Sequence, residues 1–295
     1  MAGHRHPIID THVHFWDFKD ERLKWVWLER DWIHPILGNI DAMKAVAYQI
    51  DDVWAEARFA DVEGFVHVQA AIGSADPVDE TRWLHEMRQR SAIPFTIIAD
   101  ATLGADNAAA VIDGHAESPY FVGVRDFTAE PMLAAGGTNA AYEQSLRILA
   151  ERSLVFDLDC EWPNMAAARA LAERHPDLLI VLEHIGFPRA RDDDYFENWR
   201  SGMRTLAGAP NVTCKISGVG MTDPRFTPES LRRWVETCVE VFGPARCVLG
   251  SNWPVDRLYS SYDVIMDLYR GYIAGLGETE QVAILSGNAR RLYRL

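Results

Sequence analysis

Short apolar runs alternate with longer amphipathic stretches along the whole chain. Several of the apolar runs are built from β-branched and other apolar residues throughout, which is typical of strands buried on both faces of a parallel sheet. This pattern predicts strands at 7–13, 62–70, 95–101, 121–125, 154–159, 178–183, 212–216 and 247–250.

The stretches between these runs have helical periodicity. The clearest predict helices at 51–59, 77–89, 140–152, 165–174, 195–206 and 228–242. Proline follows Asp76 and Thr227, and proline in the first turn is typical of a helix start.

About eight strand–helix units in 295 residues favour a (β/α)8 barrel, because such barrels usually take about 250 residues. A doubly wound open sheet is the alternative, and a Gly-rich phosphate turn after the first strand would favour it. That turn is absent from the sequence. The predicted fold class is therefore α/β, a TIM barrel in which residues 1–295 form a single domain.

The segment 17–43 interrupts the strand–helix rhythm directly after the first predicted strand. It contains Trp25, Trp27 and Trp32. In a barrel it would be an extended first loop over the mouth, on the face that carries function in this fold. The loop is either a hydrophobic flap packed on the rim or a lid that lines a substrate pocket.

Composition and charge narrow the classes of function. Apolar residues make up 48% and charged residues 24%, the balance of a folded chain and not of a disordered one. The net charge of −14 argues against nucleic acid or an anionic membrane as the main partner. No apolar run reaches the roughly 20 residues of a membrane span, and the N-terminus has no signal core. The four cysteines form no CxxC pair, so we expect free thiols in a reducing cytoplasm.

Histidines follow two of the predicted strands. His12 and His14 end the first run, where the alternation of a strand turns both imidazoles to the same side. His184 follows the run 178–183. Since barrel sites lie at the carboxyl ends of the strands, these three side chains can converge on one metal ion or one substrate atom.

Four motifs in this order resemble the amidohydrolase superfamily. They are Asp-x-His-x-His at 10–14, Glu-His-Ile-Gly at 183–186, Gly-Ser-Asn-Trp-Pro-Val at 250–255 and Gly-Asn-Ala-x-Arg-Leu-Tyr at 287–293. Within it the chain is most similar to the amidohydrolase-related branch, which includes sugar-acid lactonases and 2-pyrone-4,6-dicarboxylate lactonase. Phe-Trp-Asp at 15–17, Gly-Val-Arg at 123–125 and Cys-Lys-Ile-Ser-Gly at 214–218 fit the same branch.

The resemblance implies hydrolysis of a small lactone, a sugar-acid or carboxylated ring ester, at the barrel mouth. It makes His12, His14 and His184 the set that polarises the carbonyl, with one divalent metal, zinc or manganese, or with no metal. Arg125 and Lys215 would hold a substrate carboxylate or hydroxyl, with Lys215 stabilising the oxyanion.

Asn252 occupies the position after the last strand where the superfamily usually has a catalytic aspartate. An amide cannot accept a proton at neutral pH, so Asn252 can orient water or substrate but cannot be the general base. The candidates for the base are the carboxylates near the predicted strand ends or a histidine acting without metal. These carboxylates are Asp126, Asp157, Asp159, Glu161 and Asp256, with Asp159 and Glu161 nearest the end of their strand.

Arg125 marks a second departure from the superfamily. It ends the run 121–125, the strand on which two-metal members carry a bridging ligand. A cationic side chain cannot bridge two metal ions, so we expect one ion at most.

Some weaker candidates lie close to the same strand ends. We expect Gln69 to reach the mouth and His67 to be a core residue. Trp16, Trp162 and Trp253 each follow a strand, where they either wall a pocket for the substrate ring or simply pack.

The expected partner is a small molecule, and assembly into a homo-oligomer is left open. Two rival functions also stay open. One is decarboxylation or hydration on the same barrel, and the other is a binding protein that has lost catalysis.

Overall fold

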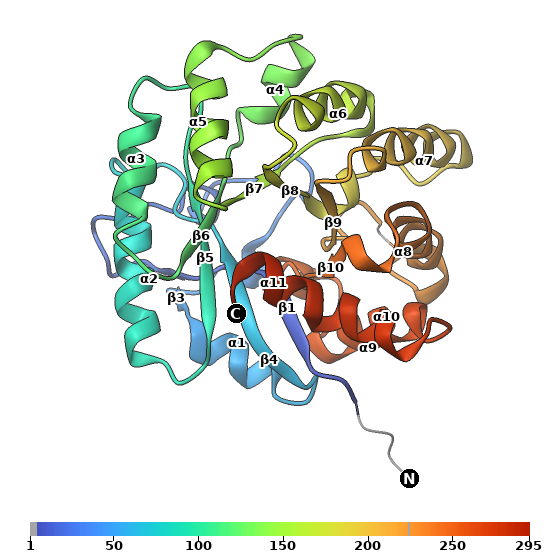
Figure 1. Cartoon of the computed structure of the whole chain (residues 1–295). Helices are drawn as coiled ribbons and strands as arrows, with labels where there is room; N and C mark the ends of the chain where they lie inside the picture. The colour runs from blue at the N-terminus through green and yellow to red at the C-terminus, as the bar shows by residue number, and fades with distance from the viewer. Residues whose placement is uncertain (1–4, 224) are drawn as a thin grey trace.

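The parallel strands form one sheet that curves into a barrel (Figure 1). The computed structural model describes residues 5–223 and 225–295. The sheet contains, in spatial order, β1 (Ile8–Val13), β4 (Val62–Val68), β5 (Phe95–Asp100), β6 (Phe121–Arg125), β7 (Val155–Leu158), β8 (Leu179–Leu182), β9 (Val212–Ile216) and β10 (Cys247–Leu249). The sequential order and the parallel pairing confirm the predicted (β/α)8 barrel and exclude the open sheet.

Helices cover the outside of this barrel (Figure 1). All six predicted helices are present, with small shifts at their ends. The described helices are α1 (Ile50–Ala57), α2 (Val78–Arg90), α3 (Ala108–His115), α4 (Ala129–Ala134), α5 (Ala140–Glu151), α6 (Met165–Arg174), α7 (Asp193–Ala207), α8 (Pro228–Phe242), α9 (Tyr262–Ile273), α10 (Glu278–Val282) and α11 (Asn288–Tyr293). None of them is long and apolar enough to span a membrane.

A buried carboxylate joins the first strand to the segment that follows the last. Asp10 accepts hydrogen bonds from the Ser251 backbone N–H at 2.8 Å, the Ser251 hydroxyl at 2.6 Å and the Tyr262 hydroxyl at 2.7 Å. The Thr11 hydroxyl donates to the Leu249 carbonyl at 2.7 Å. These bonds bring β1 beside the end of β10, which places the motifs at 10–14 and 250–255 together.

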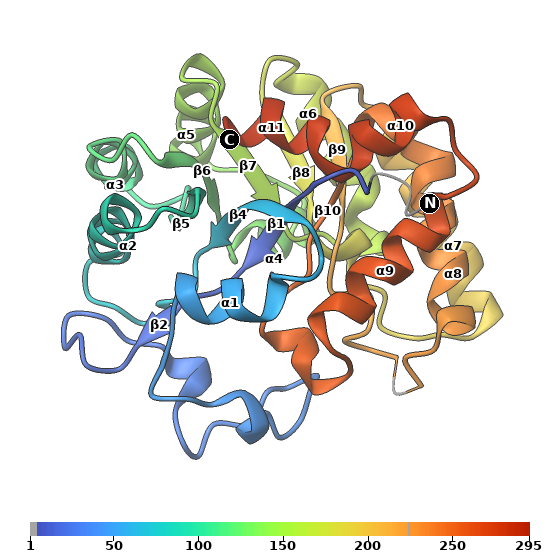
Figure 2. The same cartoon turned by 90° about the horizontal axis from the view of Figure 1, so that it is seen from below.

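The amino end of the barrel is filled with apolar side chains. Ala289, Leu292 and Tyr293 of α11 form one buried cluster with residues from seven of the strands, and α11 lies across this end (Figure 2). Water is therefore excluded from the barrel at this end, and the site must open at the other.

The extended loop after the first strand is present as expected. It leaves β1 through β2 (Trp16–Asp17), passes through two short 3₁₀ turns at Val26–Leu28 and Asp41–Met43, and returns in β3 (Ala47–Tyr48), which pairs with β2 antiparallel. Figure 2 shows this blue segment beyond the end of the barrel opposite α11. It therefore lies over the carboxyl ends of the strands.

Candidate active site

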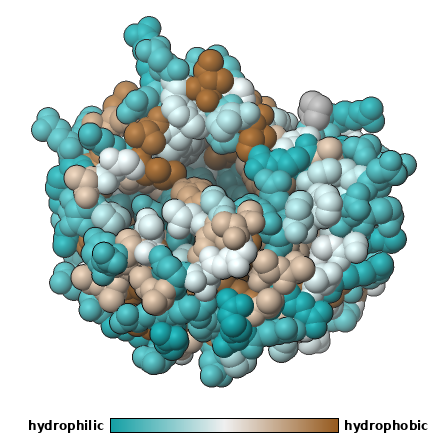
Figure 3. Space-filling view, turned by 90° about the horizontal axis from the view of Figure 1, so that it is seen from above, coloured by the Kyte–Doolittle hydropathy of each residue, from teal (hydrophilic) through white to brown (hydrophobic). Residues whose placement is uncertain are grey.

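A cavity of about 720 Å³ opens at the carboxyl ends of the strands. Seven of the predicted site residues line it: His14, Gln69, Arg125, Asp159, Glu161, His184 and Asn252. They come from the ends of six different strands or the loops just after them. In the space-filling view the hollow is bordered by hydrophobic side chains (Figure 3).

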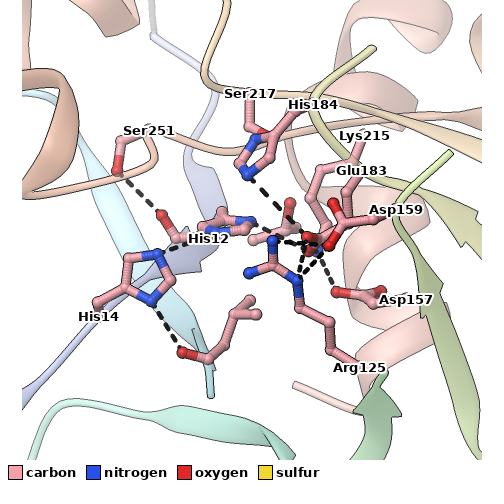
Figure 4. Close-up of polar contacts among 12 residues, drawn as sticks. His12, His14, Arg125, Asp157, Asp159, Glu183, His184, Lys215, Ser217 and Ser251 are labelled. Carbon is pink, nitrogen blue, oxygen red and sulfur yellow. Dashed lines mark hydrogen bonds and ion pairs between the residues drawn. The ribbon is translucent and has the colours of Figure 1, made fainter. Parts of the chain in front are cut away.

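The three predicted histidines meet at the floor of this cavity, which His14 and His184 line. The Nε2 atoms of His12 and His14 are 3.1 Å apart, and the ring centroids of His12 and His184 are 4.4 Å apart (Figure 4). Burial, followed by the neighbouring charges, lowers the pKa of His14 and of His184 to about 3. Burial also holds the pKa of His12 well below its ordinary value. All three imidazoles are therefore neutral at pH 7, the form that binds a metal ion.

The hydrogen bonds of these rings leave two nitrogen lone pairs in conflict. His14 Nδ1 lies 2.9 Å from the Val68 carbonyl, so Nδ1 carries the proton and Nε2 presents a lone pair. If His12 is protonated on Nδ1, which lies 3.3 Å from a Glu183 oxygen, its own Nε2 lone pair faces that of His14. If it is protonated on Nε2 instead, its Nδ1 lone pair faces the Glu183 carboxylate. A cation beside the two Nε2 atoms removes this conflict.

Glu183 is a site residue that the sequence interpretation missed. Its buried carboxylate lies 2.9 Å from Arg125 Nε, 3.1 Å from Lys215 Nζ and 3.3 Å from His12 Nδ1 (Figure 4). Burial opposes its ionisation, but Arg125, Lys215 and His12 together hold the pKa of Glu183 well below its ordinary value. A charged residue at the end of an apolar strand, directly before His184, was the signal available in the sequence.

Lys215 does not line the cavity. Its side chain is completely buried and forms ion pairs with Asp157 and Glu183 deeper in the barrel. The structure therefore does not bring Lys215 to the cavity surface, where the prediction placed its contact with the oxyanion. Lys215 instead supports Glu183 from below. Asp157 belongs to the same buried layer and cannot act as the base in the cavity.

Of the predicted bases, Asp159 is the one at the cavity floor, because it follows β7 and lines the cavity. Its carboxylate accepts hydrogen bonds from Arg125 at 2.9 Å. Burial raises the pKa of Asp159, although Arg125 opposes this. Glu161, two residues further on, also lines the cavity and pairs with Arg189.

Asp256 and Asp126 lie outside the cavity lining. Asp256 is completely buried and accepts a hydrogen bond from the Asn252 amide at 2.8 Å. Asn252, which has a left-handed φ of 57°, thus stands between Asp256 and the cavity. Asp126 accepts hydrogen bonds from the backbones of Leu103 and Thr128 and has a structural role.

The three tryptophans predicted beside strand ends do not line the cavity. Trp16 and Trp253 are buried in packing, with their indole N–H groups bonded to Ala45 and Glu56. Trp162 packs against Tyr195, outside the lining. The tryptophans that line the cavity are instead Trp27 and Trp32 of the extended loop. The loop is therefore a lid that lines the pocket, the second of the two expected forms.

The backbone that carries His184 is strained. His184 and Ile185 have φ values of 49° and 53°, in the left-handed region that costs non-glycine residues energy. Gly218 makes room for this turn, because a Cβ on Gly218 would lie 2.7 Å from His184 Nδ1. The Ser217 hydroxyl then lies 2.8 Å from the same nitrogen and fixes the ring. Strain of this kind concentrates at functional sites.

These residues fit a single divalent ion. His12, Glu183 and His184 offer ligand atoms that all lie within 4.8 Å of one another, and His14 adds the Nε2 atom described above. Imidazole and carboxylate are ligands suited to zinc. Arg125, at the end of β6, lies beside Glu183 in this group, and its cationic guanidinium cannot be a metal ligand.

Comparisons with known proteins relate the chain to one family. Residues 9–295 match the sequence model of the amidohydrolase family Amidohydro_2. The chain is 32% identical to protein y4mH of Sinorhizobium fredii over 98% of both chains. It is 27% identical to an L-fucono-1,5-lactonase of Burkholderia ambifaria, over 97% of this chain and 95% of the relative. It also resembles the zinc-bound crystal structure of an amidohydrolase from Burkholderia multivorans, with a TM-score of 0.82, 26% identity, and coverage of 98% and 99% of the two chains.

The burial of Asp256 predicts how the folding stability of the protein depends on pH. Burial, with a contribution from Asp10, raises the pKa of Asp256 to about 7, against an ordinary value of 3.8. Between these two values the folded protein holds a proton that the unfolded chain releases, so stability falls as pH rises and levels off above 7. Each pKa unit corresponds to about 1.4 kcal/mol.

Asp256→Asn removes this fall in stability with rising pH, and the new side-chain oxygen can still accept the hydrogen bond from Asn252. We expect the variant to gain folding free energy relative to the unmodified protein as pH rises from 5 to 7.5, on the order of a few kcal/mol. Urea unfolding followed by circular dichroism at several pH values measures the difference. A difference that stays constant across this range would show that Asp256 is ionised in the folded protein.

Proposed function

Since this chain belongs to the amidohydrolase family, we propose that it is a lactonase that hydrolyses a small ring ester in the cavity described above. The observation that carries the proposal is the convergence of three neutral histidines, Arg125 and Asp159 at the floor of one cavity. The relatives named L-fucono-1,5-lactonase support a lactone as the bond that is cleaved. The four cysteines are buried and unpaired, which supports a reducing compartment such as the cytoplasm.

Arg125 binds and orients the lactone. Its Nε and Nη2 atoms are engaged by Asp159 and Glu183, whereas Nη1 has no partner among the described residues and can donate to the substrate. The centre of the Phe127 ring lies 4.3 Å from the guanidinium carbon, and this cation–π contact helps to fix the guanidinium in place. A cation fixed in this way can stabilise the charge that develops on a carbonyl oxygen.

Asp159 acts as the general base in this proposal. It removes a proton from water as the water oxygen bonds to the carbonyl carbon. The bond from that carbon to the ring oxygen then breaks, and the ring oxygen takes the proton back from Asp159. One water is consumed, and the product is a hydroxy acid. Asn252 faces the same cavity and can orient the water through its side-chain oxygen, because its amide nitrogen is bonded to Asp256.

We propose that His12, His14 and His184, with Glu183 beside them, hold one divalent metal ion. When bound there, the ion would supply Lewis-acid polarisation of the lactone carbonyl. Zinc and manganese are the candidates, and imidazole ligands favour zinc. The conflict between the lone pairs of His12 and His14 is the feature of this chain that supports the ion.

Metal binding is tested by thermal unfolding with and without added zinc. A ligand at 100 times its dissociation constant stabilises a protein by about 2.7 kcal/mol, so we expect a clear rise in Tm for the unmodified protein. His14→Gln should abolish the rise, because it removes one of the two facing Nε2 atoms. His85→Ala, on helix α2 outside the cavity, is the matched control and should keep it. An equal rise in all three proteins, or none in any, would contradict the proposed metal site.

The role of Asp159 is tested by the pH profile of lactone hydrolysis. Because burial raises the pKa of Asp159, kcat/KM should fall on the acidic side as this carboxylate is protonated. Asp159→Asn should lower kcat about 10²- to 10⁴-fold and remove the acidic limb. Proton release measured with a pH indicator from pH 4.5 to 8 gives both results.

Glu161→Gln is the control for this experiment, because Glu161 lines the same cavity at the rim without contact to Arg125. It should change kcat only a few-fold and keep the acidic limb. Should Asp159→Asn retain that limb, another residue is the base. Release of CO₂ in place of a hydroxy acid would overturn the lactonase proposal itself.

A further inference from the structure

The cavity has a polar floor and apolar walls. Apart from the floor residues, most of its lining is apolar and comes from the extended loop and the segments after β6, β8 and β9. The apolar residues at the walls are Val26, Trp27, Trp32, Pro35, Ile36, Leu37, Ile40, Met43, Ile72, Phe127, Pro131, Phe187, Met221 and Val255. At about 720 Å³ the cavity lies in the upper part of the roughly 300–1,000 Å³ range of pockets for drug-sized ligands. It therefore has room for more than a single small ring.

The charged side chains of the walls, Glu130, Glu161 and Arg189, already have partners. Glu130 accepts hydrogen bonds from the Glu161 backbone at 2.7 Å and from Asn164 at 2.9 Å. Glu161 in turn pairs with Arg189. A polyhydroxylated lactone would bury hydroxyl groups against apolar walls without partners, and each such group costs about 1–3 kcal/mol.

The cavity also lacks a surplus of positive charge. Its two arginines, Arg125 and Arg189, each pair with carboxylates, and Glu130 adds a further acidic group. The net charge of the whole chain is −14. The side chains alone therefore offer a ligand with several carboxylates no cation free of a carboxylate partner, and the proposed ion adds one cationic centre only.

Gln69 is a buried polar side chain whose amide the protein leaves wholly unpaired. Its residue is 1% exposed and lines the cavity, and neither its amide nitrogen nor its amide oxygen has a partner among the described residues. Buried donors and acceptors are normally satisfied, so an unpaired amide at a binding cavity indicates a ligand that offers a complementary group. A lactone ester group supplies an acceptor for the amide nitrogen, and the water that hydrolysis consumes can donate to the amide oxygen.

We infer that the substrate is an uncharged lactone with an alkyl or aryl body, whose ester group meets Gln69 and Arg125 while the body lies against Trp27 and Trp32. This inference rests on the proposed lactonase function and narrows its substrate class. It sets aside the hydroxylated and the carboxylated rings as the preferred substrates of this chain.

The first test compares δ-lactones and a pyrone that differ in the body attached to the ring ester. The probes are dihydrocoumarin with an aryl body, δ-decalactone with an alkyl body, glucono-1,5-lactone with hydroxyl groups, and 2-pyrone-4,6-dicarboxylate with two carboxylates. We expect kcat/KM for the first two to exceed that for the last two by about 100-fold. Equal or higher kcat/KM for the hydroxylated or carboxylated probe overturns the inference and leaves the lactonase function standing.

The second test measures binding without turnover. Isothermal titration calorimetry with the lactam analogue of dihydrocoumarin should show binding to the unmodified protein. Trp32→Ala should weaken it about 10-fold, whereas Trp54→Ala, on the surface of α1 outside the cavity, should not. If none of the lactones is hydrolysed but the lactam binds in this pattern, the ligand class stands and the lactonase function fails. If the lactam does not bind, or both variants bind it equally, the inference fails.

Gln69→Leu separates a binding role from a structural one. Because the change removes an unpaired buried amide, we expect Tm to rise or stay equal while lactam affinity and kcat/KM fall about 10-fold. A structural glutamine would give a lower Tm with unchanged affinity, and that result would remove Gln69 from the site.

Discussion

The buried carboxylate of Glu183 is the interaction on which the arrangement of the site depends. It faces Lys215 from inside the barrel, Arg125 from the cavity side and His12 from the metal-binding side, all within 3.3 Å. Two cations and one imidazole from three other strands thus have the same partner. Removing one member of such a buried group leaves uncompensated charge in a low-dielectric interior, so each member holds the others in position.

This group divides the barrel interior into layers. The apolar end closed by α11 lies at one side, followed by Lys215 with Asp157 and Glu183, then the histidines with Arg125 and Asp159, and finally the cavity under the loop. With the histidines neutral, the two cations stand against three carboxylates when all are ionised. The site is therefore anionic enough to accept a divalent ion.

The alternation of apolar runs and amphipathic stretches was enough to predict the barrel. The alternation of side chains along a strand, together with the positions of the strand ends, predicted that His12, His14 and His184 converge. It was not enough to give the depth of each side chain, because the strands of a barrel are staggered along its axis. Lys215 sits within β9 and lies below the cavity, whereas Arg125 ends β6 and reaches it. The role of Glu183 was not predicted, because the next residue, His184, already accounted for the chemistry expected at this strand end.

The cavity walls were harder to predict because loop conformation has no simple period. The sequence indicated Trp16, Trp162 and Trp253 because each follows a strand. All three instead contact residues outside the cavity lining. Trp27 and Trp32 come from a long loop whose path depends on tertiary contacts, such as the bond from the Trp27 indole to the Ala70 carbonyl at 2.8 Å. The identity of the walls changes the expected substrate from a hydroxylated or carboxylated ring to an apolar one.

The kinetics of Glu183→Gln test most directly whether this carboxylate organises the site. The amide keeps the shape but loses the charge that holds Arg125 and His12, while Lys215 and Arg125 retain Asp157 and Asp159 as partners. We expect the Glu183→Gln variant to fold and its kcat for lactone hydrolysis to fall at least 100-fold. Glu143→Gln, which removes an ion-paired carboxylate on the outer helix α5, should stay within a few-fold of the unmodified protein. A Glu183→Gln variant as active as that control would contradict the account.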